Sequence, residues 1–158
     1  MYLMKHLPKI VSIQNQFSLT NRTFEIGLSE FCLKENIGML PYSTLNMGVL
    51  TGKYLNGARP EGARFSLSTR NSLRYNPNNP YAQQAIKEYV DLAKKSNLDP
   101  AQMSIAFANS KNFVSSVIIG ATKLDQLKTC IDAGDLELSE DVLNDIDKIC
   151  NTYPDVTV

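Results

Sequence analysis

The sequence predicts an α/β fold, a parallel sheet covered by helices, in one unit that spans residues 1–158. Three short apolar segments have the β-branched composition of strands, and amphipathic helical segments separate them. Strands that alternate with helices along a chain are typical of parallel sheets, because each parallel neighbour is reached by a crossover. No fixed-period repeat and no second domain is evident. The three predicted strands are Ile10–Ile13, Ile37–Tyr42 and Val114–Ile119.

The first predicted strand is expected to be buried before it gives way to the polar residues Gln14–Gln16. The residues up to Pro8 have the pattern of a helix end, and they lack the features of a signal peptide. A helix is predicted over residues 23–36, with Gly38 placed to end it. Pro41 suits the end of the second strand. The packed face of the predicted helix carries Phe24, Leu28 and Phe31.

Residues 44–80 differ in character, because glycine and proline interrupt the stretch repeatedly. A long segment without regular structure is usually either a functional loop or a disordered linker. Aromatic and apolar residues within the stretch favour the functional loop, and both interpretations stay open. These residues are Tyr54, Phe65, Leu67 and Tyr75, and the arginines among them are Arg59, Arg64, Arg70 and Arg74.

Four helices are predicted in the second half of the sequence. The first runs over residues 81–95 with an apolar face, and the second opens with Asp99 as N-cap and Pro100 at its first position. The third predicted strand, Val114–Ile119, is continuous enough in valine and isoleucine to be buried on both faces. A helix through Leu124, Leu127 and Ile131 follows it, and the last helix starts at Ser139.

Composition narrows the classes of function. Sixteen Lys and Arg residues balance sixteen Asp and Glu residues, so no net field attracts nucleic acid or an anionic membrane. The three cysteines are widely separated and the chain has one histidine, so neither a zinc site nor a disulfide framework is expected. Buried apolar packing is the interpretation for Cys32 and Cys150. No segment is apolar and long enough for a membrane span, and a reducing cytoplasm is predicted.

Ligands of parallel α/β folds bind at the carboxyl ends of the strands. The first predicted strand ends in Gln14, whose side chain suits a carboxamide, and the second ends in the aromatic Tyr42. The third ends in Gly120-Ala121-Thr122 before a helix, whose first N–H groups favour a phosphate. Together these features suit a nicotinamide dinucleotide. Each also has a purely structural explanation: a turn glycine, a packed tyrosine and a hydrogen-bonded strand-end amide.

Seven segments, in order along nearly the whole chain, resemble consecutive segments of the aldo-keto reductase family, and within it the Tas-type bacterial members. The resemblance implies that the chain is a partial (β/α)8 TIM barrel, formed by the last three strands and their helices. It would be the C-terminal half of the domain, beginning in the helix before the sixth strand. The segments are Gln14–Leu19, Leu40–Ser43, Gly48–Tyr54, Leu50–Arg64, Ile119–Thr122, Asp125–Leu127 and Leu136–Leu143.

The resemblance also implies NADP(H) as the cofactor and assigns site residues. Gln14 matches the glutamine that holds the nicotinamide carboxamide, and Tyr42 matches the aromatic residue that stacks on the nicotinamide ring. Ser43, Leu45, Gly48 and Thr51 match the loop that lines the pyrophosphate. The segment that holds the adenosine phosphate end is matched by Gly120, Ala121, Thr122 and Gln126.

Two positions depart from the family pattern. Cys130 stands where the family often has an asparagine that contacts adenine, and Gln126 stands where some members have an arginine for the 2′-phosphate. Lys123 is either a substitute for that charge or a solvated lysine at a helix start. The preference for NADP over NAD therefore comes from the family and not from these residues.

Family catalysis uses an aspartate, a tyrosine, a lysine and a histidine, all from the first half of the barrel. The tyrosine is the general acid and the lysine lowers its pKa. No catalytic residue is assigned here, since His6 and Lys9 fall at the opposite, stability face of a barrel. The chain alone is expected to be marginally stable and without reductase activity.

Three hypotheses remain open from the sequence. The first is a fragment of an NADPH-dependent carbonyl reductase, acting on a small-molecule carbonyl substrate in the intact parent. The second is a non-catalytic nucleotide-binding or interaction module that complements a separate N-terminal half. The third is a structural half-barrel that self-associates through its open sheet edges, since three parallel strands cannot close an eight-stranded barrel.

Overall fold

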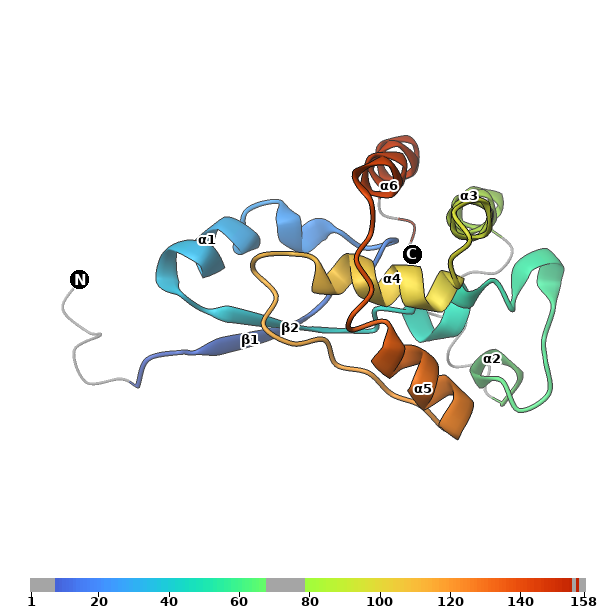
Figure 1. Ribbon diagram of the computed structural model, residues 1–158, viewed down its shortest axis with the longest axis horizontal. Helices are drawn as coiled ribbons and strands as arrows, with labels where there is room; N and C mark the ends of the chain where they lie inside the picture. The colour runs from blue at the N-terminus through green and yellow to red at the C-terminus, as the bar shows by residue number, and fades with distance from the viewer. Residues whose placement is uncertain (1–7, 68–78, 155, 157–158) are drawn as a thin grey trace.

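The computed structural model describes residues 8–67, 79–154 and 156 of the chain. α1 lies alongside a short parallel sheet, and the other helices gather near the carboxyl ends of its strands, away from the N-terminus (Figure 1). The elements are β1 (Ser12–Gln16), η1 (Thr23–Glu25), α1 (Leu28–Glu35), β2 (Gly38–Tyr42), η2 (Asn46–Thr51), η3 (Leu55–Gly57), α2 (Arg64–Leu67), α3 (Pro80–Lys95), α4 (Pro100–Asn109), α5 (Leu124–Asp132) and α6 (Glu140–Thr152).

The sheet is parallel, as predicted, but in the described residues it has two strands and not three. β1 pairs with β2 in a register that places Ser12 opposite Gly38 and Gln16 opposite Tyr42. The predicted third strand lies along the other edge of β2, where Val114 forms a single parallel bridge with Met39. Its amide groups donate to the carbonyl oxygens of β2 only at intervals, so this extended segment does not become a regular strand.

Gly38 allows this third segment to approach β2. A Cβ atom at position 38 would lie 1.9 Å from Oγ of Ser115, which is far closer than van der Waals contact. The amide N–H of Ser115 donates to the Met39 carbonyl at 2.9 Å, directly beside this contact. Gly38 therefore makes room for the Ser115 side chain and does not end α1, which was its predicted role.

Both outer segments are more exposed than their apolar sequences predict. Ile10 and Val11 precede β1 and are 65% and 72% exposed, so the first predicted strand starts two residues later and is not buried at its start. Ile118 and Ile119 are also exposed, which contradicts the prediction of burial on both faces. The predicted helix end before Pro8 lies outside the described residues.

The helix predicted over residues 23–36 is divided into two. η1 is a single 3-10 turn, and Gly27, with a φ of 123°, separates it from α1. The helix α1 ends at Asn36, which adopts the left-handed conformation of a helix C-cap. Only Phe24 of the predicted apolar face is buried, whereas Leu28 and Phe31 point to solvent.

The stretch 44–80 is more ordered than a linker. It contains η2, η3 and α2, and its apolar residues Val49, Tyr54 and Phe65 pack against α3 in a small core of their own. This favours the functional-loop interpretation over the disordered linker for residues 44–67. Arg70, Arg74, Tyr75 and the rest of 68–78 lie outside the described residues.

The helices of the second half follow the prediction closely. The Asp99 side chain accepts hydrogen bonds from the amides of Ala101 and Gln102, and Ser139 accepts from Val142. α3 buries the predicted face, including Ile86, and the predicted third helix is α5. Capping side chains specify these helix starts locally, which is why the sequence predicts them well.

Phenylalanines form the centre of the main core, on the helical side of the sheet. The ring of Phe17, just after β1, stacks on Phe107 of α4 with centroids 5.9 Å apart and meets Phe113 edge-on at 5.6 Å. Two cations lie over the Phe107 ring: the Arg22 guanidinium at 5.1 Å and the Lys111 ammonium at 4.4 Å. The core therefore joins the end of β1 to α4 directly.

Replacing Phe107 with leucine should lower the free energy of unfolding by about 1–2 kcal/mol, because the ring stacking and both cation contacts are lost while most apolar volume remains. Phe31→Leu is the matched control, since Phe31 is 55% exposed on α1 and should change stability by no more than about 0.5 kcal/mol. Urea unfolding followed by circular dichroism measures both. Equal effects of the two variants would contradict the role given to Phe107.

Candidate functional site

In the described part of the chain, one face of the sheet, the open face, has no helix packed against it, and this face carries the first two candidate residues. Side chains alternate across a strand, so Gln14 and Gln16 of β1 share a face, and Tyr42, opposite Gln16 in the register, shares it with them. Met39 and Ile13 point to the other face and pack into the core. Gln14 is exposed and Tyr42 is half-buried, so an amide and an aromatic ring are both accessible on the open face.

The candidate residues Ser43, Leu45, Gly48 and Thr51 form a tight turn directly after β2. Ser43, Asn46, Met47 and Gly48 all have positive φ, so the backbone curls in a left-handed sense. The Thr51 hydroxyl donates to the Gly48 carbonyl at 2.8 Å, and the Gly48 amide donates to the Leu45 carbonyl at 2.9 Å. The amides of Asn46 and Leu50 also donate to carbonyl oxygens within the turn, so these hydrogen bonds stabilise its left-handed conformation.

A cation lies against this turn. A Cβ atom built on Gly48 would be 2.8 Å from Nζ of Lys53, so the ammonium occupies the space beside the glycine. The same ammonium lies 5.2 Å from the ring centroid of Tyr54. Within the described ranges, Lys53 forms no ion pair with a carboxylate. Its charge is therefore available to a ligand at the turn.

A buried polar cluster fixes the position of the turn relative to β1. The Asn46 side chain is 1% exposed and donates to the Thr20 hydroxyl at 3.1 Å, and this hydroxyl in turn contacts Ser18 Oγ at 3.1 Å. The Asn46 amide also donates to the Ser43 carbonyl. Because buried polar groups are costly when unpaired, this chain of hydrogen bonds holds the turn in one position.

The third candidate segment, Gly120-Ala121-Thr122, is exposed and leads into α5. Both the amide and the hydroxyl of Thr122 donate to Oε1 of Gln126, each at 3.2 Å. Gln126 therefore closes the first turn of α5, where Lys123 is the N-cap residue but provides no capping hydrogen bond. The sequence predicted that the N–H groups at this helix start bind a phosphate. In the structure, the Thr122 amide donates its hydrogen bond to the Gln126 side chain of the same helix.

The three groups of candidates lie at the same end of the sheet. The Ile118 amide donates to the Pro41 carbonyl at 2.9 Å, which brings the segment before Gly120 alongside the end of β2. Leu45 of the turn packs against the cluster that contains Cys130 of α5. The structure thus gathers the sheet face, the turn and the start of α5 at one edge, as expected for a parallel α/β site.

Cys130 belongs to the core and not to an open surface. Its side chain is buried against Ile105 and Ala133, and burial, together with the charge of Asp99, raises the pKa of the thiol above its ordinary value. A raised pKa keeps the sulfur protonated, which agrees with a packing role. Cys32 is also buried, as predicted, whereas Cys150 is only partly so.

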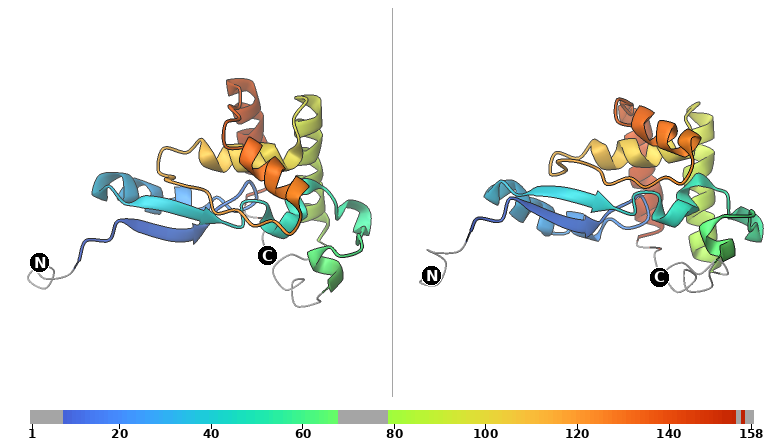
Figure 2. Two further views of the ribbon diagram at one scale, coloured as in Figure 1. Left: turned by 60° about the horizontal axis from the view of Figure 1, so that its bottom comes forward. Right: turned by 90° about the horizontal axis from the view of Figure 1, so that it is seen from below.

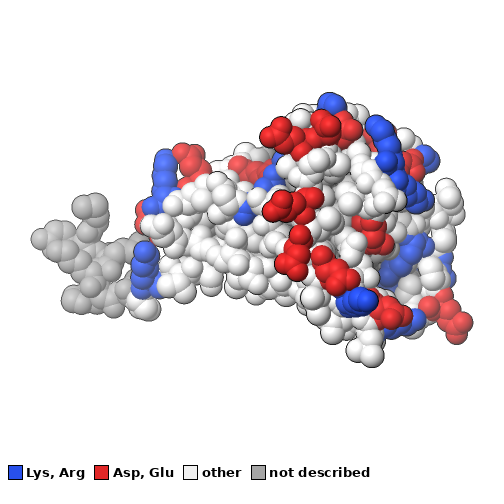
Figure 3. Space-filling model, in the orientation of Figure 1, with Lys and Arg blue, Asp and Glu red and all other residues white. Residues whose placement is uncertain are grey.

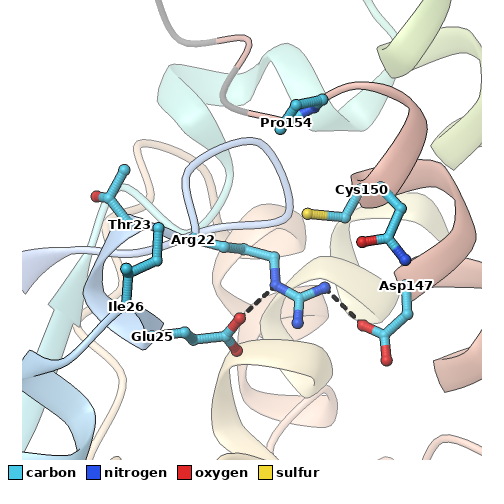
Figure 4. A pocket seen from close by; sticks show the side chains of 8 residues that line it. Arg22, Thr23, Glu25, Ile26, Asp147, Cys150 and Pro154 are labelled. Atoms are coloured by element: carbon cyan, nitrogen blue, oxygen red, sulfur yellow. Dashed lines mark hydrogen bonds and ion pairs between the residues drawn. The ribbon is translucent and has the colours of Figure 1, made fainter.

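A pocket of about 410 Å³ lies elsewhere, between η1 and the end of α6 (Figure 4). Its centre is Arg22, which contacts carboxylate oxygens of Glu25 and Asp147, each at 2.6 Å. Burial would lower the pKa of the Arg22 guanidinium, but the hydrogen bonds to Glu25 and Asp147 raise it above its ordinary value. With its donors directed to these carboxylates, Arg22 joins η1 to α6, and none of the candidate residues lines the pocket.

Other kinds of site were sought in the same residues. The described part of the chain has no group of three or more His, Cys, Asp and Glu side chains arranged to hold a metal ion. It also has no helix of the length and apolar character needed to cross a membrane.

Sequence reasoning missed two residues of the candidate site. Gln16 shares the open face with Gln14, whereas Asn15 points to the other face, where its Oδ1 accepts a hydrogen bond from the Gln16 amide at 2.7 Å. The alternation of side chains along a strand, extended from Gln14 to Gln16, would have identified Gln16 as a site residue. Lys53 lies within the segment Gly48–Tyr54, but its approach to Gly48 depends on a backbone conformation that the sequence does not reveal.

Comparison with known proteins gives a consistent result. The model of the Aldo/keto reductase family matches residues 1–151. Protein tas of Escherichia coli (strain K12) is 51% identical over 150 residues, which cover 94% of this chain and 42% of that protein. A putative voltage-gated potassium channel subunit beta of Schizosaccharomyces pombe is 31% identical, over 91% of this chain and 43% of that protein.

The fold also matches a solved structure. A glycerol dehydrogenase from Gluconobacter oxydans superposes with a TM-score of 0.73 at 23% identity, covering 94% of this chain and 44% of that one. The chain thus spans less than half the length of the relatives it matches. The family match extends over nearly all of its residues, and the chain therefore belongs to the aldo-keto reductase family, of which it represents a part.

Proposed function

We propose that this chain is the cofactor-binding, C-terminal half of an NADP(H)-dependent aldo-keto reductase, and that it lacks the catalytic residues of the family. The observation that carries the proposal is the open sheet face, where the Gln14 amide and the Tyr42 ring are accessible beside the left-handed turn. In the intact parent, the reaction is hydride transfer between the nicotinamide and a small-molecule carbonyl substrate. On the family's precedent we also place the protein in the cytoplasm.

The sheet face has the chemistry that a nicotinamide requires. The Gln14 side chain carries both a donor and an acceptor, so it can pair with a carboxamide, which also has one of each. The Tyr42 ring offers a flat apolar surface on which an aromatic ring stacks. Gln16 shares this face and lies opposite Tyr42 in the register. When bound there, the cofactor supplies the hydride, and these side chains hold and orient it.

The turn after β2 has the chemistry that a pyrophosphate requires. Ser43, Leu45, Gly48 and Thr51 set its backbone, and Lys53 adds a positive charge beside Gly48. The buried hydrogen bond between Asn46 and Thr20 holds the turn in place. Such preorganisation lowers the entropic cost of binding.

The adenosine end is assigned to Gly120, Ala121, Thr122 and Gln126 at the start of α5. In the structure, Gln126 already accepts from the Thr122 amide, so a phosphate there would compete with this side chain or rely on the neighbouring amides. Lys123 precedes the helix and is the cation of this segment for a 2′-phosphate. We assign NADP on the family's precedent. We expect the adenosine end to contribute less to the affinity for the cofactor than the sheet face and the turn do.

Binding of NADPH to the chain should depend on the sheet face. Tyr42→Ala should weaken the affinity at least about ten-fold, because ring stacking contributes on the order of 1–3 kcal/mol, whereas Tyr42→Phe should retain most of it. Gln14→Ala should also weaken binding, and Gln84→Ala on the exposed face of α3 is its control. The chain contains no tryptophan, so titration followed by tyrosine fluorescence reports binding. Unchanged affinity in Tyr42→Ala and Gln14→Ala would refute the assignment.

Lys53→Gln should weaken NADPH binding about ten-fold and reduce its dependence on salt, because a charge-assisted contact to phosphate is lost. Lys94→Gln serves as the control, since Lys94 lies exposed on α3 away from the turn. Isothermal titration at two ionic strengths measures both effects. A loss that is the same at both ionic strengths would count against a direct charge contact.

The chain alone should not oxidise NADPH in the presence of an aldehyde. The family's proton-donating tyrosine and the lysine that lowers its pKa have no counterpart among these residues, so carbonyl protonation lacks its acid. The loss of NADPH absorbance in the presence of an aromatic aldehyde measures turnover. Steady turnover by the purified chain would show that other residues of this half supply the acid.

A further inference from the structure

The hydroxyl group of Tyr54 is buried without a hydrogen-bond partner. Its oxygen is the one buried side-chain polar atom left unpaired in the part of the chain that the structure describes, and the residue is only 3% exposed. A buried hydroxyl normally has a partner, because its lost contacts with water are otherwise uncompensated. Tyr89, which is also buried, follows this rule, since its hydroxyl donates to the Leu19 carbonyl. The unpaired hydroxyl of Tyr54 therefore needs an explanation other than stability.

Apolar packing accounts for the Tyr54 ring but not for its hydroxyl. The segment that contains η2, η3 and α2 lies beside α3 (Figure 2). In the core between them, the Tyr54 ring meets the Phe65 ring edge-on, with centroids 4.8 Å apart. A phenylalanine would fill the same place and would leave no polar atom unpaired. The same core also contains the buried apolar residues Val49, Ala82, Ala85, Ile86, Val90 and Val156.

The hydroxyl end of the ring faces Gly48. A Cβ atom at Gly48 would lie 3.9 Å from Cε2 of Tyr54, and Cε2 is bonded to the carbon that carries the hydroxyl. The same Cβ position is 2.8 Å from Nζ of Lys53, so the ammonium and the phenol both approach the space beside this glycine. A positive charge and a hydrogen-bond donor thus converge at Gly48, where the chain has no side chain of its own.

The charge of Lys53 differs from most charges on the surface of the molecule. Figure 3 shows Lys and Arg side chains beside Asp and Glu over much of the helical surface. Lys87, for example, pairs with Asp91 on α3. Within the described ranges, Lys53 has no such carboxylate partner. A cation and a hydroxyl donor at one point favour an anion with several oxygen atoms, because charge-assisted hydrogen bonds are strong.

We propose that the Tyr54 hydroxyl and the Lys53 ammonium form an anion subsite beside Gly48, which binds a diphosphate group. The inference rests on the proposed function in one respect, because there the diphosphate is that of NADP(H). A diphosphate has oxygen atoms on both phosphorus atoms, so it can bind the ammonium and accept from the hydroxyl at once. Lys53 is only partly buried and its side chain is flexible, so it can adjust as it brings the anion to the hydroxyl. The hydroxyl then gains the partner that it lacks in the chain alone.

Tyr54→Phe separates this role from packing. The variant keeps the ring and removes the unpaired hydroxyl, so the midpoint of urea unfolding of the chain alone should be unchanged or raised. Its affinity for NADPH should fall about ten-fold, because a charge-assisted hydrogen bond is lost. Tyr89→Phe is the matched control, and its urea midpoint should fall, because it loses a paired hydroxyl. A lower midpoint in Tyr54→Phe, or an unchanged affinity for NADPH, would overturn the proposal.

Inorganic pyrophosphate tests the subsite apart from the nicotinamide. By isothermal titration, Tyr54→Phe and Lys53→Gln should each weaken pyrophosphate binding at least about five-fold, since each removes one of the two contacts. Tyr81→Phe is the control for binding, because its hydroxyl donates to the Thr152 carbonyl and takes no part in the subsite. Pyrophosphate that does not bind to the unaltered chain at millimolar concentration would overturn the proposal, as would equal binding to Tyr54→Phe.

The two probes distinguish a failure of the subsite from a failure of the proposed function. Tyr42→Ala should weaken the binding of NADPH and leave that of pyrophosphate unchanged, because pyrophosphate has no ring to stack. If Tyr42→Ala and Gln14→Ala both left NADPH binding unchanged while Tyr54→Phe still weakened pyrophosphate binding, the nicotinamide assignment would fail and the subsite would stand. The reverse pattern, with NADPH binding sensitive to Tyr42→Ala and both ligands insensitive to Tyr54→Phe, would overturn the subsite alone.

Discussion

The contact between Phe17 and Phe107 determines how the sheet sits on its helices. Phe17 follows β1 directly, so its position fixes the carboxyl end of the strand, and the stacked ring of Phe107 belongs to α4. Arg22 and Lys111 lie over the same ring and share the carboxylate of Glu25, so apolar packing and charge act on one point. Arg22 continues this junction to Asp147 of α6, so three separate segments are tied to the end of β1.

The same junction leaves the opposite face of the sheet open. Met39 and Ile13 fill the helical side, and alternation along the strands then sends Gln14, Gln16 and Tyr42 to the other side. These side chains do not pack into the core, so a binding site on this face requires a rigid backbone beneath them. The core side supplies that rigidity through Phe17 and through the Tyr89 hydroxyl, which donates to the Leu19 carbonyl at 3.0 Å. Burial raises the pKa of Tyr89, so this donor keeps its proton.

The sequence predicted best those features that are specified within a few residues. Asp99 and Ser139 cap their helices as expected, because a capping side chain acts on amides two or three positions away. The parallel pairing of β1 and β2 was also predicted, from the alternation of elements. The left-handed turn at Met47 and Gly48, the approach of Lys53 and the pairing of Thr122 with Gln126 were not, because they depend on backbone conformations that residue types do not determine. The ligand roles of Gln14 and Tyr42 remain predictions.

The failures of prediction at Val11 and Ile118 have one physical explanation. An apolar run in a sequence reflects the environment for which a strand is suited. The run that contains Val11 was predicted to be buried, and the run that contains Ile118 was predicted to be buried on both faces. In this chain each lies on an outer row, beside one neighbour and not two. Their side chains are therefore exposed although their sequences are those of buried strands. The third row fails to become a regular strand for the same reason, since a strand gains much of its order from a partner on each side and from cover on both faces. The mismatch between pattern and burial thus marks two exposed apolar surfaces, one beside each outer row.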